Sequence, residues 1–330
     1  MTLCITLVVL VVWLASGPVS SDTDRPIVGI LSLPLEGDRH ERGSYIAASY
    51  VKFVEAGGAR AVPIDFDIAH DDLLELLSHL SGVLLTGGGA DLDPHKRVSH
   101  SIVTIVDYVL NENANGRALP LFGICLGFEA IAAALSHLAI GVLDRFDALD
   151  IAMPLEFTRN AWGGRMFPAS RPGGLAVFQD LQTLNITYNH HVMGVSPAKF
   201  QETLSSRLRV VATNVDRAQR RFVSAFEGVE APIFGVQFHP EKPLFEWASR
   251  YAIPHTGPAR SAGQYLADLF IDACKRSHAT FPSVQAEDAH LIYNFSPMFT
   301  GKQGSMFVQE YRFPPVSARA SSSRPRVQAQ

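Results

Sequence analysis

The feature that most constrains the fold is a regular alternation of short apolar segments and amphipathic segments over residues 25–138. The apolar segments, which have the composition of buried strands, are residues 25–33, 59–65, 81–89 and 118–124. The amphipathic segments, whose apolar residues recur at helical spacing, are residues 44–58, 70–80 and 127–138. Strands separated by single helices imply βαβ units. We therefore predict an α/β fold, a three-layer α/β/α sandwich around a mainly parallel sheet.

The second half of the chain continues with three β-rich segments and one long helix. The β-rich segments are residues 207–214, 221–228 and 232–240, and the helix covers residues 257–277. The polar, Ser/Arg-rich end, residues 316–330, has the composition of a disordered tail. A length of 330 residues could hold two domains, but larger α/β folds often fill it with one. We place one folded domain at residues 22–315.

Composition and charge exclude several classes of partner. The chain is 47% hydrophobic and 18% charged, as in an ordinary soluble globular protein. Its net charge is −4, and no cluster of Lys or Arg marks a surface for nucleic acid or for an anionic membrane. We expect neither partner.

The N-terminus predicts a secretory signal peptide over residues 1–21. An apolar run of about a dozen residues is followed by small residues, and Val19 and Ser21 suit a cleavage site near Ser20 or Ser21. A membrane anchor is the alternative, but a span needs about 20 apolar residues. We expect the protein to enter the secretory route and to be secreted or delivered to a lysosome or vacuole.

Secretion makes two sequons relevant: Asn185-Ile-Thr and Asn294-Phe-Ser. Such tripeptides are common by chance, and Pro297 follows closely after the second. Asn185 is therefore the stronger candidate for a glycan.

Cleavage of the signal peptide would leave two cysteines, Cys125 and Cys274. Two cysteines in a chain of this size do not make a disulfide scaffold. Cys274 falls on the apolar stripe of the helix over residues 257–277, which predicts a small core residue. Cys125 instead lies between two glycines at the end of an apolar run, and it needs another explanation.

The segment G-I-C-L-G, residues 123–127, matches the nucleophile-elbow pattern G-x-Nu-x-G with cysteine as the nucleophile. Flanking glycines let the backbone turn sharply, so that the central side chain stands clear of the sheet. The free N–H groups and positive dipole end of the following helix lower a thiol pKa and can hold an oxyanion. The alternative is a small residue in a tight turn, and the pattern alone leaves both interpretations open.

A second segment, F-H-P-E, supports the interpretation as a nucleophile. His239 and Glu241 lie two residues apart at the end of an apolar strand. In an extended chain, residues two apart face the same side, so Glu241 can orient the imidazole of His239. The order Cys125, His239, Glu241 then supplies a nucleophile, a base and a group that orients the base.

Together these residues resemble the class I glutamine amidotransferase-like (flavodoxin-like) fold and, within it, the gamma-glutamyl hydrolase (folylpolyglutamate hydrolase) family. The resemblance covers essentially the whole mature chain. It is carried by YIAASYVKFVEAGGARAVPI, GVLLTGGGADL, GICLGFE, DIAMPLEFT, RMF, FGVQFHPEKPLFEW and LIYNFSP.

The resemblance implies a role for each matching residue. Cys125 is the nucleophile, His239 the general base and acid, and Glu241 the orienting group. Backbone N–H groups near Gly88 or Gly89 and at Leu126 form the oxyanion hole. His191 matches a histidine near the family's pocket. Adjacent histidines in an extended segment point in opposite directions, so His190 and His191 are a poor pair of metal ligands.

A γ-linked substrate carries an α-carboxylate on each unit, so its pocket needs positive or N–H-rich groups. Arg165, Lys242 and His191 are the candidates, and a surface role is as well supported for each. No His/Cys/Asp/Glu spacing suggests a metal, and the chemistry needs no cofactor.

The predicted function is cysteine-dependent hydrolysis of γ-glutamyl bonds in folate or antifolate poly-γ-glutamates. The expected partner is that small-molecule substrate, and a homodimer stays open. Two alternatives remain: a glutaminase that passes ammonia to a synthetase, and a secreted binding protein without chemistry. No synthetase domain is present, which disfavours the glutaminase. All three residues of the predicted triad are present, which disfavours the binding protein.

Overall fold

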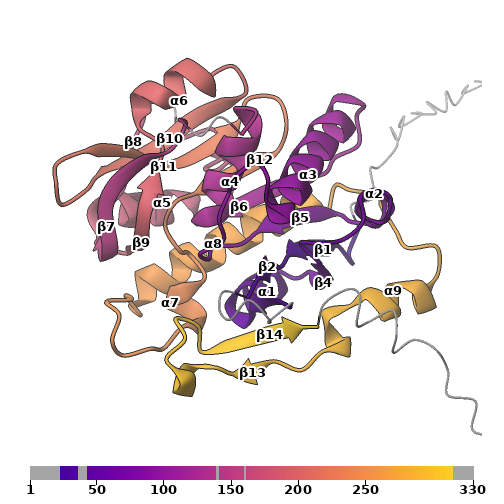
Figure 1. Cartoon of the computed structure of the whole chain (residues 1–330). Helices are drawn as coiled ribbons and strands as arrows, with labels where there is room; N and C mark the ends of the chain where they lie inside the picture. The colour runs from indigo at the N-terminus through magenta and orange to yellow at the C-terminus, as the bar shows by residue number, and fades with distance from the viewer. Residues whose placement is uncertain (1–22, 36–42, 139–140, 160, 315–330) are drawn as a thin grey trace, which may run out of the picture.

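The computed structural model describes residues 23–35, 43–138, 141–159 and 161–314, and its centre is an eight-stranded sheet (Figure 1). The strand order is β4-β1-β5-β6-β12-β11-β10-β8. The parallel strands are β4 (Arg60–Ile64), β1 (Ile27–Leu31), β5 (Gly82–Leu85), β6 (Leu121–Ile124) and β12 (Ile233–Val236). The antiparallel strands are β11 (Arg221–Gly228), β10 (Leu208–Val215) and β8 (Glu156–Phe157). The predicted mainly parallel sheet is confirmed.

Two layers of helices cover the sheet, because successive strand residues face opposite sides. In β1, Val28 and Ile30 join one apolar core, whereas Ile27 and Leu31 join the other. The first core contains the apolar faces of α1 (Ala48–Ala56), α5 (Gly174–Thr183) and α8 (Gly257–Cys274). The second contains those of α2 (His70–Ser78), α3 (Arg97–Ala114), α4 (Leu126–Leu135) and α6 (Pro197–Thr203). This is the predicted three-layer α/β/α sandwich, and Figure 1 shows α1 and α4 on opposite sides of it.

Smaller elements close the ends of the sandwich. An antiparallel sheet contains β13 (Met298–Phe299), β14 (Gln309–Phe313), β3 (Ser44–Ala47) and β2 (Leu33–Pro34). A separate antiparallel pair contains β7 (Asp144–Met153) and β9 (Thr187–Gly194). The short helices are α7 (Lys242–Phe245), α9 (Val284–His290), η1 (Ile292–Asn294) and η2 (Gly301–Gln303). Because β14 pairs with β3, the chain as far as Phe313 belongs to the folded body.

Two predicted elements need new boundaries, and some elements were missed. The predicted helix over residues 44–58 begins only at Ala48, because Ser44–Ala47 pairs as a strand with β14. The helix ends at Ala56, and Gly58 follows with φ 93°. The predicted strand over residues 232–240 ends at Val236. Helix α3 was not predicted, although its buried apolar residues recur at helical spacing.

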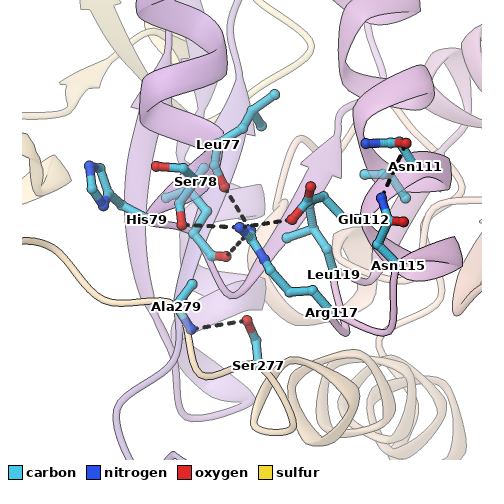
Figure 2. Close-up of polar contacts among 12 residues, drawn as sticks. Leu77, Ser78, His79, Asn111, Glu112, Asn115, Arg117, Leu119, Ser277 and Ala279 are labelled. Carbon is cyan, nitrogen blue, oxygen red and sulfur yellow. Dashed lines mark hydrogen bonds and ion pairs between the residues drawn. The ribbon is translucent and has the colours of Figure 1, made fainter.

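Arg117, which follows α3 in the chain, connects the C-terminal end of α2 to α3 (Figure 2). Its guanidinium donates to the carbonyl oxygens of Leu77 at 3.0 Å, Ser78 at 3.2 Å and Leu80 at 3.4 Å, and pairs with Glu112 at 3.2 Å. The last carbonyls of a helix have no partner within the helix. The single side chain thus satisfies the end of α2 just before β5 begins.

The predicted signal peptide, residues 1–21, and the predicted tail, residues 316–330, lie outside the described residues. Within the described part of the chain, no helix is both long enough and apolar enough to cross a membrane.

Candidate active site

Three neighbouring parallel strands deliver the predicted site to one edge of the sheet. β5 leads to Gly87, β6 to Cys125 and β12 to His239. Carboxyl ends of parallel strands share an edge, and this edge is where open α/β sheets bind ligands. The fold therefore brings together residues that lie more than one hundred positions apart in the chain.

The elbow at Cys125 is a strained turn that its glycines make possible. Cys125 has φ 53° and ψ −106°, a region that costs of order 1–3 kcal/mol for a residue with a side chain. A Cβ added at Gly123 would lie 2.5 Å from the carbonyl oxygen of Gly127, and one at Gly127 would lie 2.1 Å from that of Leu85. The predicted elbow is thus present, and both glycines are required by close backbone approach.

His239 and Glu241 form the predicted pair. His239 Nδ1 lies 2.8 Å from Glu241 Oε1, and both side chains are buried. The reason we predicted for the contact is wrong: the strand ends at Val236, and Glu241 has helical φ and ψ of −75° and −31°. The turn that leads into α7 makes the contact, and the N–H of His239 donates to the Tyr188 carbonyl at 2.8 Å.

Gly87 lies close to both Cys125 and the imidazole of His239. A Cβ at this position would lie 2.9 Å from His239 Cε1 and 3.2 Å from Cys125 Cβ. His239 Nε2, the nitrogen not held by Glu241, is buried and has no hydrogen-bond partner among the described residues. Nε2 is therefore the atom available to exchange a proton with Cys125 or with a bound substrate.

The pKa shifts at the site favour a neutral Cys125 thiol and a neutral His239 imidazole in the resting protein. Burial raises the pKa of the Cys125 thiol well above its usual range, and the nearby Glu129 carboxylate raises it further. Burial also lowers the pKa of His239, although Glu241 opposes this effect. A neutral imidazole beside a neutral thiol can act as a base when the thiol attacks.

Tyr50 is a site residue that the sequence analysis treated only as core. Its hydroxyl accepts the N–H of Gly87 at 2.9 Å and lies 3.5 Å from His239 Nδ1. The side chain is fully buried, and burial followed by the charge of Glu241 raises its pKa well above the usual value. Tyr50 therefore fixes the glycine turn against the His239–Glu241 pair, but helical spacing gives no signal for this role.

A cavity of about 490 Å³ opens beside Cys125. Gly88, Gly89 and Leu126, the predicted oxyanion-hole residues, line it together with the thiol. The rest of the wall is mainly apolar and includes Ala90, Leu92, Ala133, Leu138, Val142, Leu143, Leu149, Val192 and Met193. No Lys or Arg of the described residues lines this cavity.

Glu129 brings a buried carboxyl into the same cavity and was not predicted. It lies one helical turn after Cys125, its backbone N–H donates to the Cys125 carbonyl at 3.1 Å, and its side chain is 6% exposed. Gln237 Nε2 donates to its Oε1 at 2.9 Å. Burial raises the pKa of Glu129 to about 7, and the bond from Gln237 opposes this rise. In the sequence, the only indication of this role was that Glu129 ends the segment GICLGFE, which carries the family resemblance.

His191 lines the cavity as expected, but so does His190, contrary to the expected opposite orientations. His191 Nδ1 lies 2.7 Å from the Met193 carbonyl oxygen, and burial lowers its pKa to about 4. His190 packs against the edge of Tyr251, and burial lowers its pKa to about 4 as well. Both rings are therefore neutral near pH 7.

The other two substrate-binding candidates lie elsewhere. Arg165 donates to the carbonyl oxygens of Gly228 at 3.1 Å, Val229 at 3.2 Å and Glu230 at 2.7 Å, so it closes the turn after β11. Lys242 is buried and does not line the cavity. Neither side chain is placed to meet an α-carboxylate in the cavity. Among the described residues, no group of three His, Cys, Asp or Glu side chains could hold a metal ion.

A thiol on a strand-to-helix elbow, beside a buried His–Glu pair and an open cavity, defines a cysteine-type hydrolase of the α/β class. A profile of the peptidase C26 family matches residues 26–241. The chain belongs to this family.

Characterised relatives match nearly the full length. Mouse (Mus musculus) gamma-glutamyl hydrolase is 35% identical over 303 residues, which cover 90% of this chain and 92% of the mouse protein. The human (Homo sapiens) gamma-glutamyl hydrolase is 34% identical over 302 residues, which cover 90% of this chain and 92% of the human protein. Gamma-glutamyl hydrolase 1 of Arabidopsis thaliana is 35% identical over 309 residues, which cover 90% of this chain and 86% of the plant protein.

Proposed function

We propose that this protein hydrolyses γ-glutamyl amide bonds in folate and antifolate poly-γ-glutamates, with Cys125, His239 and Glu241 as its triad. One observation carries the proposal: the elbow presents Cys125 to the cavity, and Gly87 approaches both Cys125 and the imidazole of His239 that Glu241 holds. Family membership and the activity for which the relatives are named support the γ-glutamyl bond as the target.

In the acylation step, His239 Nε2 accepts the thiol proton as Cys125 Sγ attacks the γ-carbonyl carbon. The tetrahedral intermediate collapses when the C–N bond breaks, and the imidazolium gives its proton to the leaving amine. A thioester and a free amine result. Glu241, hydrogen-bonded to Nδ1, keeps the correct tautomer and stabilises the imidazolium while it exists.

In the deacylation step, His239 takes a proton from water as the water attacks the thioester carbon. The C–S bond then breaks, and the proton returns to sulfur. Both tetrahedral intermediates carry an oxyanion. We expect the backbone N–H of Leu126, at the start of α4, and that of Gly88 or Gly89 to receive it, because these residues line the cavity beside Cys125.

The substrate's α-carboxylates meet no Lys or Arg among the described residues of the cavity wall. The groups that remain are the N–H-rich turn at Gly88 and Gly89 and the N-terminal end of α4, both of which favour anions. The apolar wall suits the uncharged methylenes and aromatic portion of a folate.

The test offers pteroyl-γ-polyglutamate, its α-linked isomer and free glutamine to the purified protein and separates the products by chain length. We expect cleavage of the first alone, with release of glutamate or short γ-glutamyl peptides. A preference for glutamine would instead establish a glutaminase. No cleavage of any of the three would favour a binding protein of the same fold.

A further inference from the structure

Lys242 is a buried cation without a direct partner. Its side chain is fully buried, and Nζ has neither a hydrogen bond nor an ion pair to any residue that the structure describes. Burial of an uncompensated ammonium group is costly, so such a residue needs a compensating interaction. The triad mechanism above does not use it.

Two aromatic rings enclose the ammonium group. Nζ lies 5.5 Å from the centre of the Tyr188 ring and 5.4 Å from that of Phe307. Aromatic faces attract cations at this distance, most strongly where water is excluded. The rings hold the charge at a defined place without neutralising it.

That place adjoins the triad. Lys242 directly follows Glu241 and is the first residue of α7. The centre of the Tyr188 ring, which contacts Nζ, also lies 6.3 Å from the centre of the His239 ring. The backbone carbonyl of Tyr188 accepts the backbone N–H of His239. The ammonium group is therefore fixed against the same residues that position the imidazole.

The site around Cys125 is otherwise acidic. The titratable groups that act on the thiol or pack around it are Glu129 on α4, His239 and Glu241 in the turn after β12, Tyr50 on α1 and Lys242 on α7. Burial and the carboxylates of Glu129 and Glu241 raise the pKa of the thiol, whereas Lys242 and the Leu126 N–H lower it. Formation of a thiolate adds a negative charge where two carboxylates already lie.

We propose that Lys242 is a positioning residue whose buried charge stabilises the Cys125 thiolate, and this inference rests on the role proposed for Cys125. Lys242 does not touch substrate, because it does not line the cavity. Its effect passes through the low-dielectric interior, where a fixed charge acts more strongly than it would in water.

The test compares Lys242→Met, which removes the charge and keeps the length, with Lys242→Arg, which keeps the charge. Both are made in a background that carries Cys4→Ala and Cys274→Ala, so that iodoacetamide reports on Cys125 alone. The alkylation rate is measured against pH. Because the pKa of the thiol lies well above its usual range, the rates are compared below the midpoint, where we expect Lys242→Met to react about tenfold more slowly than the parent at each pH. We expect Lys242→Arg to follow the parent.

Hydrolysis should change in kcat and not in KM, since the cavity wall is intact. A folded Lys242→Met protein with the parental alkylation profile would overturn the inference. If neither Lys242→Met nor Lys242→Gln folds while Lys242→Arg does, the charge is structural and the inference also fails. Alkylation needs no substrate, so failure of the proposed activity would be seen separately as absent hydrolysis with a normal alkylation profile.

Discussion

Glu129→Gln should make the protein more stable at pH 8 than its parent, and this gain should shrink as the pH falls. Glutamine retains the oxygen that accepts the bond from Gln237 Nε2 and removes only the ionisation. The parent's carboxyl is buried, and its pKa rises from 4.5 to about 7 in the folded state. The folded parent therefore keeps a proton between pH 4.5 and 7 that the unfolded chain loses.

The sign and the size follow from linkage. The raised pKa contributes stability that is fully present below about pH 4.5 and is lost as the pH rises through about 7. Each pKa unit corresponds to about 1.4 kcal/mol, so the loss approaches about 3 kcal/mol by pH 8. The uncharged variant has no such loss, and the difference between the two proteins should grow by about that amount between pH 4 and 8.

The measurement is urea unfolding of both proteins at several pH values, with the free energy of unfolding extrapolated to water. Glu75→Gln, which changes an exposed side chain on α2, is the matched control for loss of one carboxylate. A stability difference between Glu129→Gln and the parent that stays constant from pH 4 to 8 would refute the reasoning. It would mean that the carboxyl is already solvated through the cavity.

Cys125→Ala and Cys125→Ser should lower the rate of hydrolysis by several powers of ten and leave the protein folded, as activity assays and circular dichroism would show. Cys274→Ala, the control, should change the rate little. An active Cys125→Ala enzyme would end the proposed mechanism. His239→Asn should be about as damaging as loss of the thiol, and Glu241→Gln less so, because the acid only orients the base; normal turnover in both variants would make this segment structural. We propose that the native protein begins near residue 21 or 22, so N-terminal sequencing should not find Met1. We also propose that it carries a glycan at Asn185, which is exposed. Endoglycosidase should then shift the mass of the parent but not that of Asn185→Gln.

Asn294 provides a contrast with Asn185. Its Nδ2 atom donates to the carbonyl oxygens of Asp288 at 2.7 Å and Leu291 at 2.9 Å. A glycan on that nitrogen would disrupt at least one of these bonds. The sequence favoured Asn185 only because Pro297 follows Asn294 closely. The hydrogen bonds of Asn294 add a structural reason for the same choice.

The sequence by itself determined the elements whose signals are local. The elbow at Cys125 could be predicted because glycine at 123 and 127 is required by contacts within one strand–turn–helix unit and its neighbour. The parallel sheet could be predicted from alternating periodicities, since both periods arise from backbone geometry. The pairing of His239 with Glu241 was also predicted correctly, although the turn into α7, and not an extended strand, makes the contact.

Tertiary structure alone decided which distant groups share the site. Tyr50 has the helical spacing of a core residue and Glu129 lies one helical turn after Cys125, and only the placement of α1 and α4 around the strand ends turns them toward the triad. Arg165 and Lys242 are cations of the type a polyanion needs, yet packing commits one to backbone carbonyls and encloses the other between two rings. Periodicity reports which face of an element is buried, whereas the identity of the groups across that face depends on contacts between segments far apart in the chain.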